Sequence, residues 1–131
     1  MSIQALSHLA LDGRLRVPAR EVKSYVHALL SATEATDREL AQGVGMAEAQ
    51  FNRLASSRGG AVKSQTLFPL RRVALLVEEG LKALSAQGLK RWLREPNAYL
   101  DDVPPILCLR SDKELRKVTG LLAAIRYGFP A

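Results

Sequence analysis

The sequence predicts an all-α protein made of two helical parts. Apolar residues recur at spacings of three and four along most of the chain, which is the period of a helix with one buried face. Helix-start signals of the Ser/Thr-x-x-Glu type occur at Thr36 and Ser111, and Pro or Gly stands at the ends of several apolar stripes. The 131 residues, 47% of them hydrophobic, suffice for one domain or two small ones.

Composition and charge argue against several classes of protein. Lys and Arg number 19 against 13 Asp and Glu, and the net charge of +6 suits a polyanionic partner without requiring one. The single Cys108 permits neither an intrachain disulfide nor a multi-cysteine metal site, and His8 and His27 stand alone, so no metal or cofactor is expected. No residues combine nucleophile, base and orienting group, so an enzyme is not expected. Without a membrane span or signal peptide, the protein is expected in the cytoplasm.

Two amphipathic helices are expected before residue 37. The first covers residues 2–11 and closes at Asp12-Gly13. The second starts at Pro18, a residue suited to the first helical position, and runs to about Ala32. We expect this second helix to pack behind the next pair through five residues: Val22, Tyr25, Val26, Leu29 and Leu30.

Residues 37–56 are predicted to form two short helices joined by a tight turn, a helix-turn-helix. Thr36 and Glu39 form the capping box that starts the first helix. Gly45 can adopt a positive φ at the corner, and Ala41 leaves room for the second helix. The angle between the helices is expected to be filled by Leu40, Val44, Met46, Phe51 and Leu54.

The second helix of this pair is expected to present a polar face to DNA. Projected at 100° per residue, its outward side carries Ala49, Asn52, Arg53 and Ser56. Asn pairs with adenine, Arg with guanine, and the Ala49 methyl offers a contact to thymine. Glu48 argues against DNA, because a carboxylate there repels phosphate unless it accepts from a cytosine amino group. The same helix pair can also serve as scaffold or dimer contact.

A basic stretch follows the helix pair. No acidic residue occurs from position 49 to 77, while five basic residues accumulate: Arg53, Arg58, Lys63, Arg71 and Arg72. Residues 57–66, with Gly59-Gly60, are predicted to form a mobile loop in which Arg58 and Lys63 are best placed to contact phosphates. The alternative is a solvated basic face with no partner.

The remaining residues are predicted to hold a linking helix and three short helical segments. We therefore divide the chain into an N-terminal helical domain, residues 1–66, and a C-terminal part, residues 67–131. The linking helix covers residues 69–84 with an apolar stripe of Leu70, Val73, Ala74, Val77, Leu81 and Leu84.

The three short segments are separated by helix breakers. Pro96-Asn97 ends the first, and Pro104-Pro105 begins a helical turn over residues 106–109, for which a buried strand is the alternative. A second capping box, Ser111 to Glu114, opens the last helix, which Gly128 ends. That helix has an apolar seam able to meet its own core or another subunit: Leu115, Val118, Leu122 and Ile125.

The C-terminal third also carries short motifs in a particular order. These are Trp92-Leu93, Pro96-Asn97, Leu100, Pro104 or Pro105 before Ile106-Leu107, and Ile125-Arg126-Tyr127-Gly128. The order resembles the toxin-binding domain of the Xre/MbcA/ParS antitoxin family, in which an Xre-type helix-turn-helix precedes that domain. The family's Gly-rich turn is replaced here by Asp101-Asp102-Val103, and its Thr-Glu-Gly by Ser111-Asp112-Lys113.

The resemblance implies a function through association. It implies an antitoxin that covers the active site of a RES-domain or related toxin, an NAD-consuming enzyme similar to ADP-ribosyltransferases, and that represses its own operon by binding operator DNA. The alternative is a stand-alone helix-turn-helix regulator without a toxin partner. We also expect a homodimer, because helix-turn-helix proteins usually read paired half-sites.

The end of the chain is the predicted toxin-binding segment: Arg126, Tyr127, Gly128, Phe129, Pro130 and Ala131. A helix that stops at Gly128 leaves residues 129–131 few intrachain partners, and Pro130 restricts their conformations before binding. Phe129 is expected to enter a nucleotide-sized cleft of the toxin. The alternative is that Phe129 packs back onto the last helix. Residues expected to serve the core rather than a contact are Trp92, Leu93, Ile106, Leu107 and Tyr127.

Overall fold

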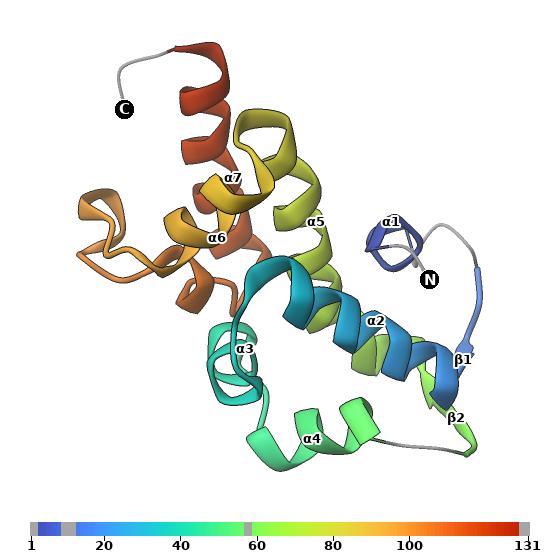
Figure 1. The fold of residues 1–131 in the computed structure, drawn as a ribbon. Coiled ribbons are helices and arrows are strands. Elements are labelled where there is room, and N and C mark those ends of the chain that lie inside the picture. The colour runs from blue at the N-terminus through green and yellow to red at the C-terminus, as the bar shows by residue number, and fades with distance from the viewer. Residues whose placement is uncertain (1–2, 9–12, 57–58, 129–131) are drawn as a thin grey trace.

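The computed structural model describes residues 3–8, 13–56 and 59–128, and it is helical almost throughout (Figure 1). Its elements are α1 (Ile3–Ser7), β1 (Arg16–Pro18), α2 (Ala19–Thr33), α3 (Asp37–Val44), α4 (Glu48–Ser56), β2 (Ala61–Lys63), η2 (Ser64–Leu67), α5 (Phe68–Ala83), α6 (Ala86–Arg94), η3 (Ala98–Leu100), η4 (Pro105–Leu107) and α7 (Asp112–Tyr127). The all-α prediction is confirmed, with one short two-stranded ribbon added. No helix in these ranges is long and apolar enough to cross a membrane.

Helix α5 forms the centre of the hydrophobic core. It packs against α1, α2, α3, α6 and α7, and the core cluster takes residues from both sides of position 66. Its buried face differs from the predicted stripe, because Leu76 is fully buried while Leu81 is 51% exposed. The reason lies at Gly80, where an added Cβ would stand 2.5 Å from Leu89 Cδ1 of α6. Helix α6 crosses α5 there and covers the Gly80 side.

The N-terminal helices differ from the prediction at their ends. Helix α1 has five residues, Ile3–Ser7, whereas helix was expected through residue 11, and residues 9–12 lie outside the described ranges. Pro18 is the N-cap of α2 rather than its first helical residue. The helix ends at Glu34, which adopts a left-handed conformation and whose N–H donates to the Leu30 carbonyl. The predicted core residues Val22, Tyr25, Val26 and Leu29 are buried.

A mobile loop was predicted for residues 57–66, but residues 61–67 form strand β2 and the 3-10 helix η2. Strand β2 pairs antiparallel with β1, joining Arg16 to Lys63, Val17 to Val62 and Pro18 to Ala61. The Ser64 N–H donates to the Leu15 carbonyl and the Ala19 N–H to the Gly60 carbonyl, so the pairing extends at both ends. The ribbon is stable because Val17 is fully buried and the strands are held against α2.

Helices α3 and α4 are joined by a three-residue turn, as the sequence predicted. The Thr36 hydroxyl accepts from the Glu39 N–H, and the Glu39 carboxylate accepts from the Thr36 N–H. Gly45 ends α3 with φ +76°, the left-handed conformation that glycine adopts without steric cost. Leu40, Ala41, Val44, Phe51 and Leu54 are all buried between the helices and the core.

The C-terminal segments begin and end near the predicted helix breakers and caps, with one difference at the start of α7. The Ser111 hydroxyl accepts from the Glu114 N–H, but the Glu114 carboxylate accepts from the Arg110 N–H, so the return bond of the capping box is displaced by one residue. Residues 105–107 form a 3-10 turn and not a strand. Gly128 ends α7 with φ +72°.

Candidate functional site

The outward face of α4 carries the four residues predicted to contact DNA. Ala49, Asn52, Arg53 and Ser56 are exposed, while Phe51 and Leu54 on the opposite side are buried. Ser56 Oγ donates to the Asn52 carbonyl (2.7 Å), which holds the hydroxyl against its own helix. Within the described ranges, the side chains of Asn52 and Arg53 have no hydrogen-bond or ion-pair partner. Both groups are therefore available to an outside ligand.

The basic stretch does not form one continuous face. Arg71 Nε donates to the Ser7 carbonyl (2.8 Å), and the Arg72 guanidinium is occupied by three backbone carbonyls, so both are structural residues rather than phosphate ligands. Lys63 lies exposed on β2, as its predicted role requires. Arg58 lies outside the described residues.

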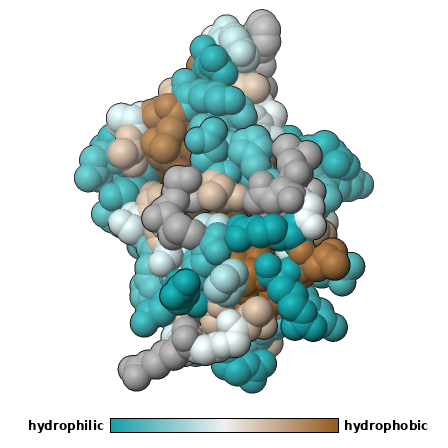
Figure 2. Space-filling view, turned by 90° about the vertical axis from the view of Figure 1, so that its right-hand side faces the viewer, coloured by the Kyte–Doolittle hydropathy of each residue, from teal (hydrophilic) through white to brown (hydrophobic). Residues whose placement is uncertain are grey.

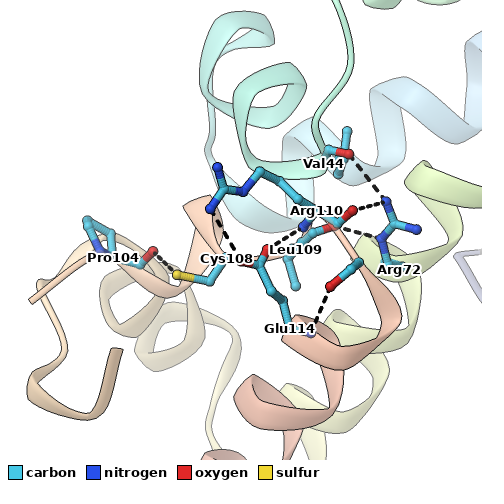
Figure 3. A network of polar contacts seen from close by, with 8 residues as sticks. Val44, Arg72, Pro104, Cys108, Leu109, Arg110 and Glu114 are labelled. Carbon is cyan, nitrogen blue, oxygen red and sulfur yellow. Dashed lines mark hydrogen bonds and ion pairs between the residues drawn. The ribbon is translucent and has the colours of Figure 1, made fainter. Parts of the chain in front are cut away.

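Arg72 is the centre of a junction between α3 and the C-terminal segments (Figure 3). Its Nε donates to the Leu109 carbonyl (2.6 Å), and its Nη2 donates to the carbonyls of Val44 (3.2 Å) and Arg110 (3.1 Å). The guanidinium thereby ties α5 to the last residue of α3 and to the segment before α7. This role could not be predicted from the sequence, because the three acceptors are backbone atoms of residues distant in the chain.

At the same junction, α3 and η4 meet backbone to backbone. The Leu109 N–H donates to the Gly43 carbonyl (3.0 Å), and a Cβ added to Gly43 would lie 2.0 Å from the Ile106 carbonyl oxygen. Two ion pairs lie farther out between α6 and the N-terminal half, Lys90 with Glu34 (3.3 Å) and Arg94 with Glu39 (3.7 Å). The helix pair and the C-terminal segments are thus directly attached to each other.

A cavity of about 530 Å³ lies between residues 100–108 and the first turns of α7. Leu100, Val103 and Leu107 form its apolar wall, while Lys113 and Lys117 stand at its edge. The sequence prediction did not include this cavity, because it is assembled from three separate segments. Its shape and mixed lining suit an apolar side chain from a partner that carries negative charge nearby.

Two titratable side chains that line this cavity have displaced pKa values. Partial burial raises the pKa of the Cys108 thiol, so Cys108 is not a reactive thiolate at neutral pH. Partial burial also works to raise the pKa of Glu114. Hydrogen bonds from the Arg110 backbone and guanidinium outweigh that effect, so the pKa of Glu114 lies below its ordinary value. Glu114 therefore stays a carboxylate near neutral pH and keeps Arg110 at the cavity.

The end of α7 is more exposed than the sequence indicated. Tyr127 is 60% exposed, so the expectation that it serves the core is wrong. Ile125, the last residue of the predicted apolar seam, is 44% exposed. The Arg126 guanidinium lies 5.0 Å from the centre of the Tyr127 ring, a cation–π distance. Both side chains lie on the last turn of the helix, which projects beyond the core that would have covered them. Phe129, Pro130 and Ala131 lie outside the described residues.

The remaining predicted core residues of the C-terminal part behave as expected or nearly so. Leu93 and Ile106 are buried, while Trp92 and Leu107 are half-buried.

Figure 2 shows one face of the molecule, where hydrophobic side chains form small separate groups in a mainly hydrophilic surface. Among the described residues, no group of three or more His, Cys, Asp or Glu side chains is arranged to hold a metal ion.

The described part of the chain is thus an all-α fold in which a helix pair with an exposed polar face is attached to helical segments that border a surface cavity. Residues 76–128 match the family model described as the antitoxin Xre/MbcA/ParS C-terminal toxin-binding domain. The matched residues agree with the family resemblance that the sequence motifs indicated. A search of curated proteins finds no match.

The fold is similar to a chain in a solved structure, the crystal structure of the M. tuberculosis MbcT-MbcA toxin-antitoxin complex. The TM-score is 0.60 at 20% sequence identity, and the similarity covers 83% of this chain and 96% of that chain. It therefore extends well beyond the residues of the family match into the N-terminal half. At this identity the similarity shows a shared fold.

Proposed function

We propose that the protein is an antitoxin that binds and neutralises a cognate toxin through the domain at residues 76–128. The observation that carries this proposal is the match of these residues to a toxin-binding domain. The cavity beside α7 and the exposed last turn of that helix supply apolar and charged groups for such a contact. Binding without catalysis is sufficient for this function, because an antitoxin acts by covering its target.

The proposed toxin is a RES-domain or related NAD-consuming enzyme. Arg126 and Tyr127 are exposed where α7 ends, and residues 129–131 continue from this turn. An aromatic side chain suits the base or ribose region of a nucleotide-sized cleft. We propose that Phe129 enters this cleft while the cavity anchors the domain on the toxin surface.

Co-expression with the toxin candidate encoded next to this gene tests the proposal. The two proteins are expected to purify as one complex, and the complex is expected to have lost the toxin's NAD-consuming activity. A neighbouring protein with no affinity for this chain, or the absence of such a neighbour, would favour the stand-alone regulator.

Repression of its own operon is the second proposed function. It is supported by the α4 face, where Asn52 and Arg53 are exposed without intrachain partners. A homodimer belongs to this proposal, because paired half-sites are read by paired helices. Mobility shifts with the DNA upstream of the gene test repression, and light scattering tests the dimer. A mass near 14.3 kDa at all accessible concentrations would contradict the dimer.

A further inference from the structure

The β1–β2 ribbon carries two positively charged side chains directly opposite each other. Arg16 of β1 is in register with Lys63 of β2, and Val17 is in register with Val62. Side chains alternate between the two faces of a strand, and Val17 is fully buried. Arg16 and Lys63 therefore share the outer face of the ribbon, where both are exposed.

The charge of this pair is not neutralised within the described part of the chain. Neither Arg16 nor Lys63 has an ion pair there. The nearby Arg14 contrasts with them, because its guanidinium donates to both carboxylate oxygens of Glu21 (2.9 and 3.2 Å). Like charges directly opposite in a sheet oppose strand pairing. A folded ribbon that keeps such a pair on its surface is suited to bind an anion.

The ribbon lies on the same side of the molecule as α4, near the C-terminal end of that helix. Both elements pack on α2, and Figure 1 shows them at the same end of the molecule, away from the last turn of α7. Five Cα steps separate Ser56 at the end of α4 from Ala61 at the start of β2, so they are at most about 19 Å apart. A major groove is about 12 Å wide, so the phosphates that flank a groove entered by α4 lie at a distance comparable to this separation.

We propose that Arg16 and Lys63, together called the basic ribbon, contact the phosphate backbone of DNA beside the groove that α4 enters. This inference rests on the proposed DNA binding and adds a second point of contact, contributed by a strand that precedes α2. An acidic protein segment would also match the charge of the ribbon. Its position near the end of the helix that carries Asn52 and Arg53 favours DNA, since those side chains suit base edges.

The test measures the affinity of the full chain for two duplexes, the DNA upstream of its gene and a random sequence, over a range of salt concentrations. The double variant Arg16→Gln/Lys63→Gln is expected to bind both duplexes about 10- to 100-fold more weakly at 0.1 M salt, with the slope of log affinity against log salt reduced by about two. The single Lys63→Gln variant is expected to reduce that slope by about one.

A matched control removes the same charge elsewhere. Arg91 on α6 and Arg116 on α7 are exposed and do not line the cavity, so Arg91→Gln/Arg116→Gln lowers the net charge equally and is expected to leave the salt slope unchanged. The ribbon variant is expected to melt at the same temperature as the wild type or slightly higher, because the like-charge pair is gone.

The outcomes separate this inference from the proposed repression. An unchanged salt slope in both ribbon variants, with the wild type binding DNA, overturns the basic ribbon alone. If the ribbon substitutions weaken toxin binding and leave DNA binding unchanged, the ribbon binds an acidic protein. That result also overturns the proposed contact between the ribbon and DNA. Salt-dependent binding to both duplexes without preference, weakened by the ribbon substitutions, supports the ribbon while contradicting operator recognition. A wild-type protein that binds neither duplex overturns both.

Discussion

Gly43 of α3 lies against the carbonyl oxygen of Ile106 so closely that a Cβ at Gly43 would stand 2.0 Å from that oxygen. The Gly43 carbonyl also accepts the Leu109 N–H (3.0 Å). The obstruction is backbone on both sides, so no side-chain rotation can relieve it. The only way to admit a methyl group is to separate α3 from η4.

Gly43→Ala is therefore expected to destabilise the protein by about 2 kcal/mol or more, although alanine is the better helix former by about 1 kcal/mol. Urea unfolding of the full chain measures this. Gly120→Ala is the matched control, because nothing lies within 4 Å of a Cβ at that exposed position of α7, and it is expected to stabilise the protein by up to about 1 kcal/mol. Equal stability of Gly43→Ala and the wild type would contradict the close contact.

Arg72→Met is expected to destabilise the protein by about 2 to 3 kcal/mol. The side chain is 14% exposed, and its removal leaves the Leu109, Arg110 and Val44 carbonyls without a charged donor. Thermal or urea unfolding gives the difference. Lys82→Met is the control, since the exposed Lys82–Glu79 pair contributes less than about 0.5 kcal/mol. Comparable losses in the two variants would show that Arg72 does not hold the junction together.

The stability of the fold is expected to fall in acid partly through Glu21. The hydrogen bond from Arg14 lowers the pKa of Glu21 below its ordinary value, despite the opposing effect of burial. A carboxylate with a lower pKa in the folded state stabilises the protein above its unfolded pKa of about 4.3, and this stabilisation is lost as the pH falls toward the folded pKa.

Urea unfolding at a series of pH values checks this contribution. Between about pH 5 and pH 3 the wild type is expected to lose more stability than Glu21→Gln, which has no carboxylate to protonate. Parallel stability curves for the two proteins would show that the Arg14–Glu21 pair does not contribute.

Deletion of residues 129–131 is expected to leave the melting temperature nearly unchanged and to abolish much of the protection against the toxin. The last helix ends at Gly128, and the buried residues of α7 are Leu115, Val118 and Leu122, which lie well before the deletion. Growth rescue in cells that express the toxin provides the readout. A truncated chain that unfolds, or one that protects fully, would count against the role of Phe129.

The start of α3 and the ends of α3 and α7 could be predicted because their causes are local. The Thr36–Glu39 capping box and the left-handed glycines at Gly45 and Gly128 involve only neighbouring residues, so the sequence displays them directly. The ribbon could not be predicted, because each strand has three residues and is too short to show an alternating pattern.

Two other features depend on segments that are distant in the sequence: which face of α5 is buried, and what the Arg71 and Arg72 side chains contact. Leu81 satisfied the helical period, but α6 crosses over Gly80, so Leu76 is buried in its place. The sequence places Arg72 in a basic stretch expected at the surface, whereas in the fold its guanidinium donates to three backbone carbonyls. The α4 face was predictable because its neighbours in the chain determine which side is apolar, whereas the cavity beside α7 requires three segments to meet.

The central claim is that residues 76–128 bind a toxin, and titration of the purified toxin with the full chain tests it most directly. The variant Lys113→Glu/Lys117→Glu reverses the charge of two residues that line the cavity, while the ribbon variant Arg16→Gln/Lys63→Gln alters a part of the molecule away from it (Figure 1). The wild type and the ribbon variant are expected to bind and inhibit the toxin equally, and the cavity variant is expected to bind at least tenfold more weakly, a loss of about 1.4 kcal/mol. Binding that is equally strong in all three proteins would contradict the assigned surface, and a wild-type chain that does not bind the toxin would contradict the claim itself.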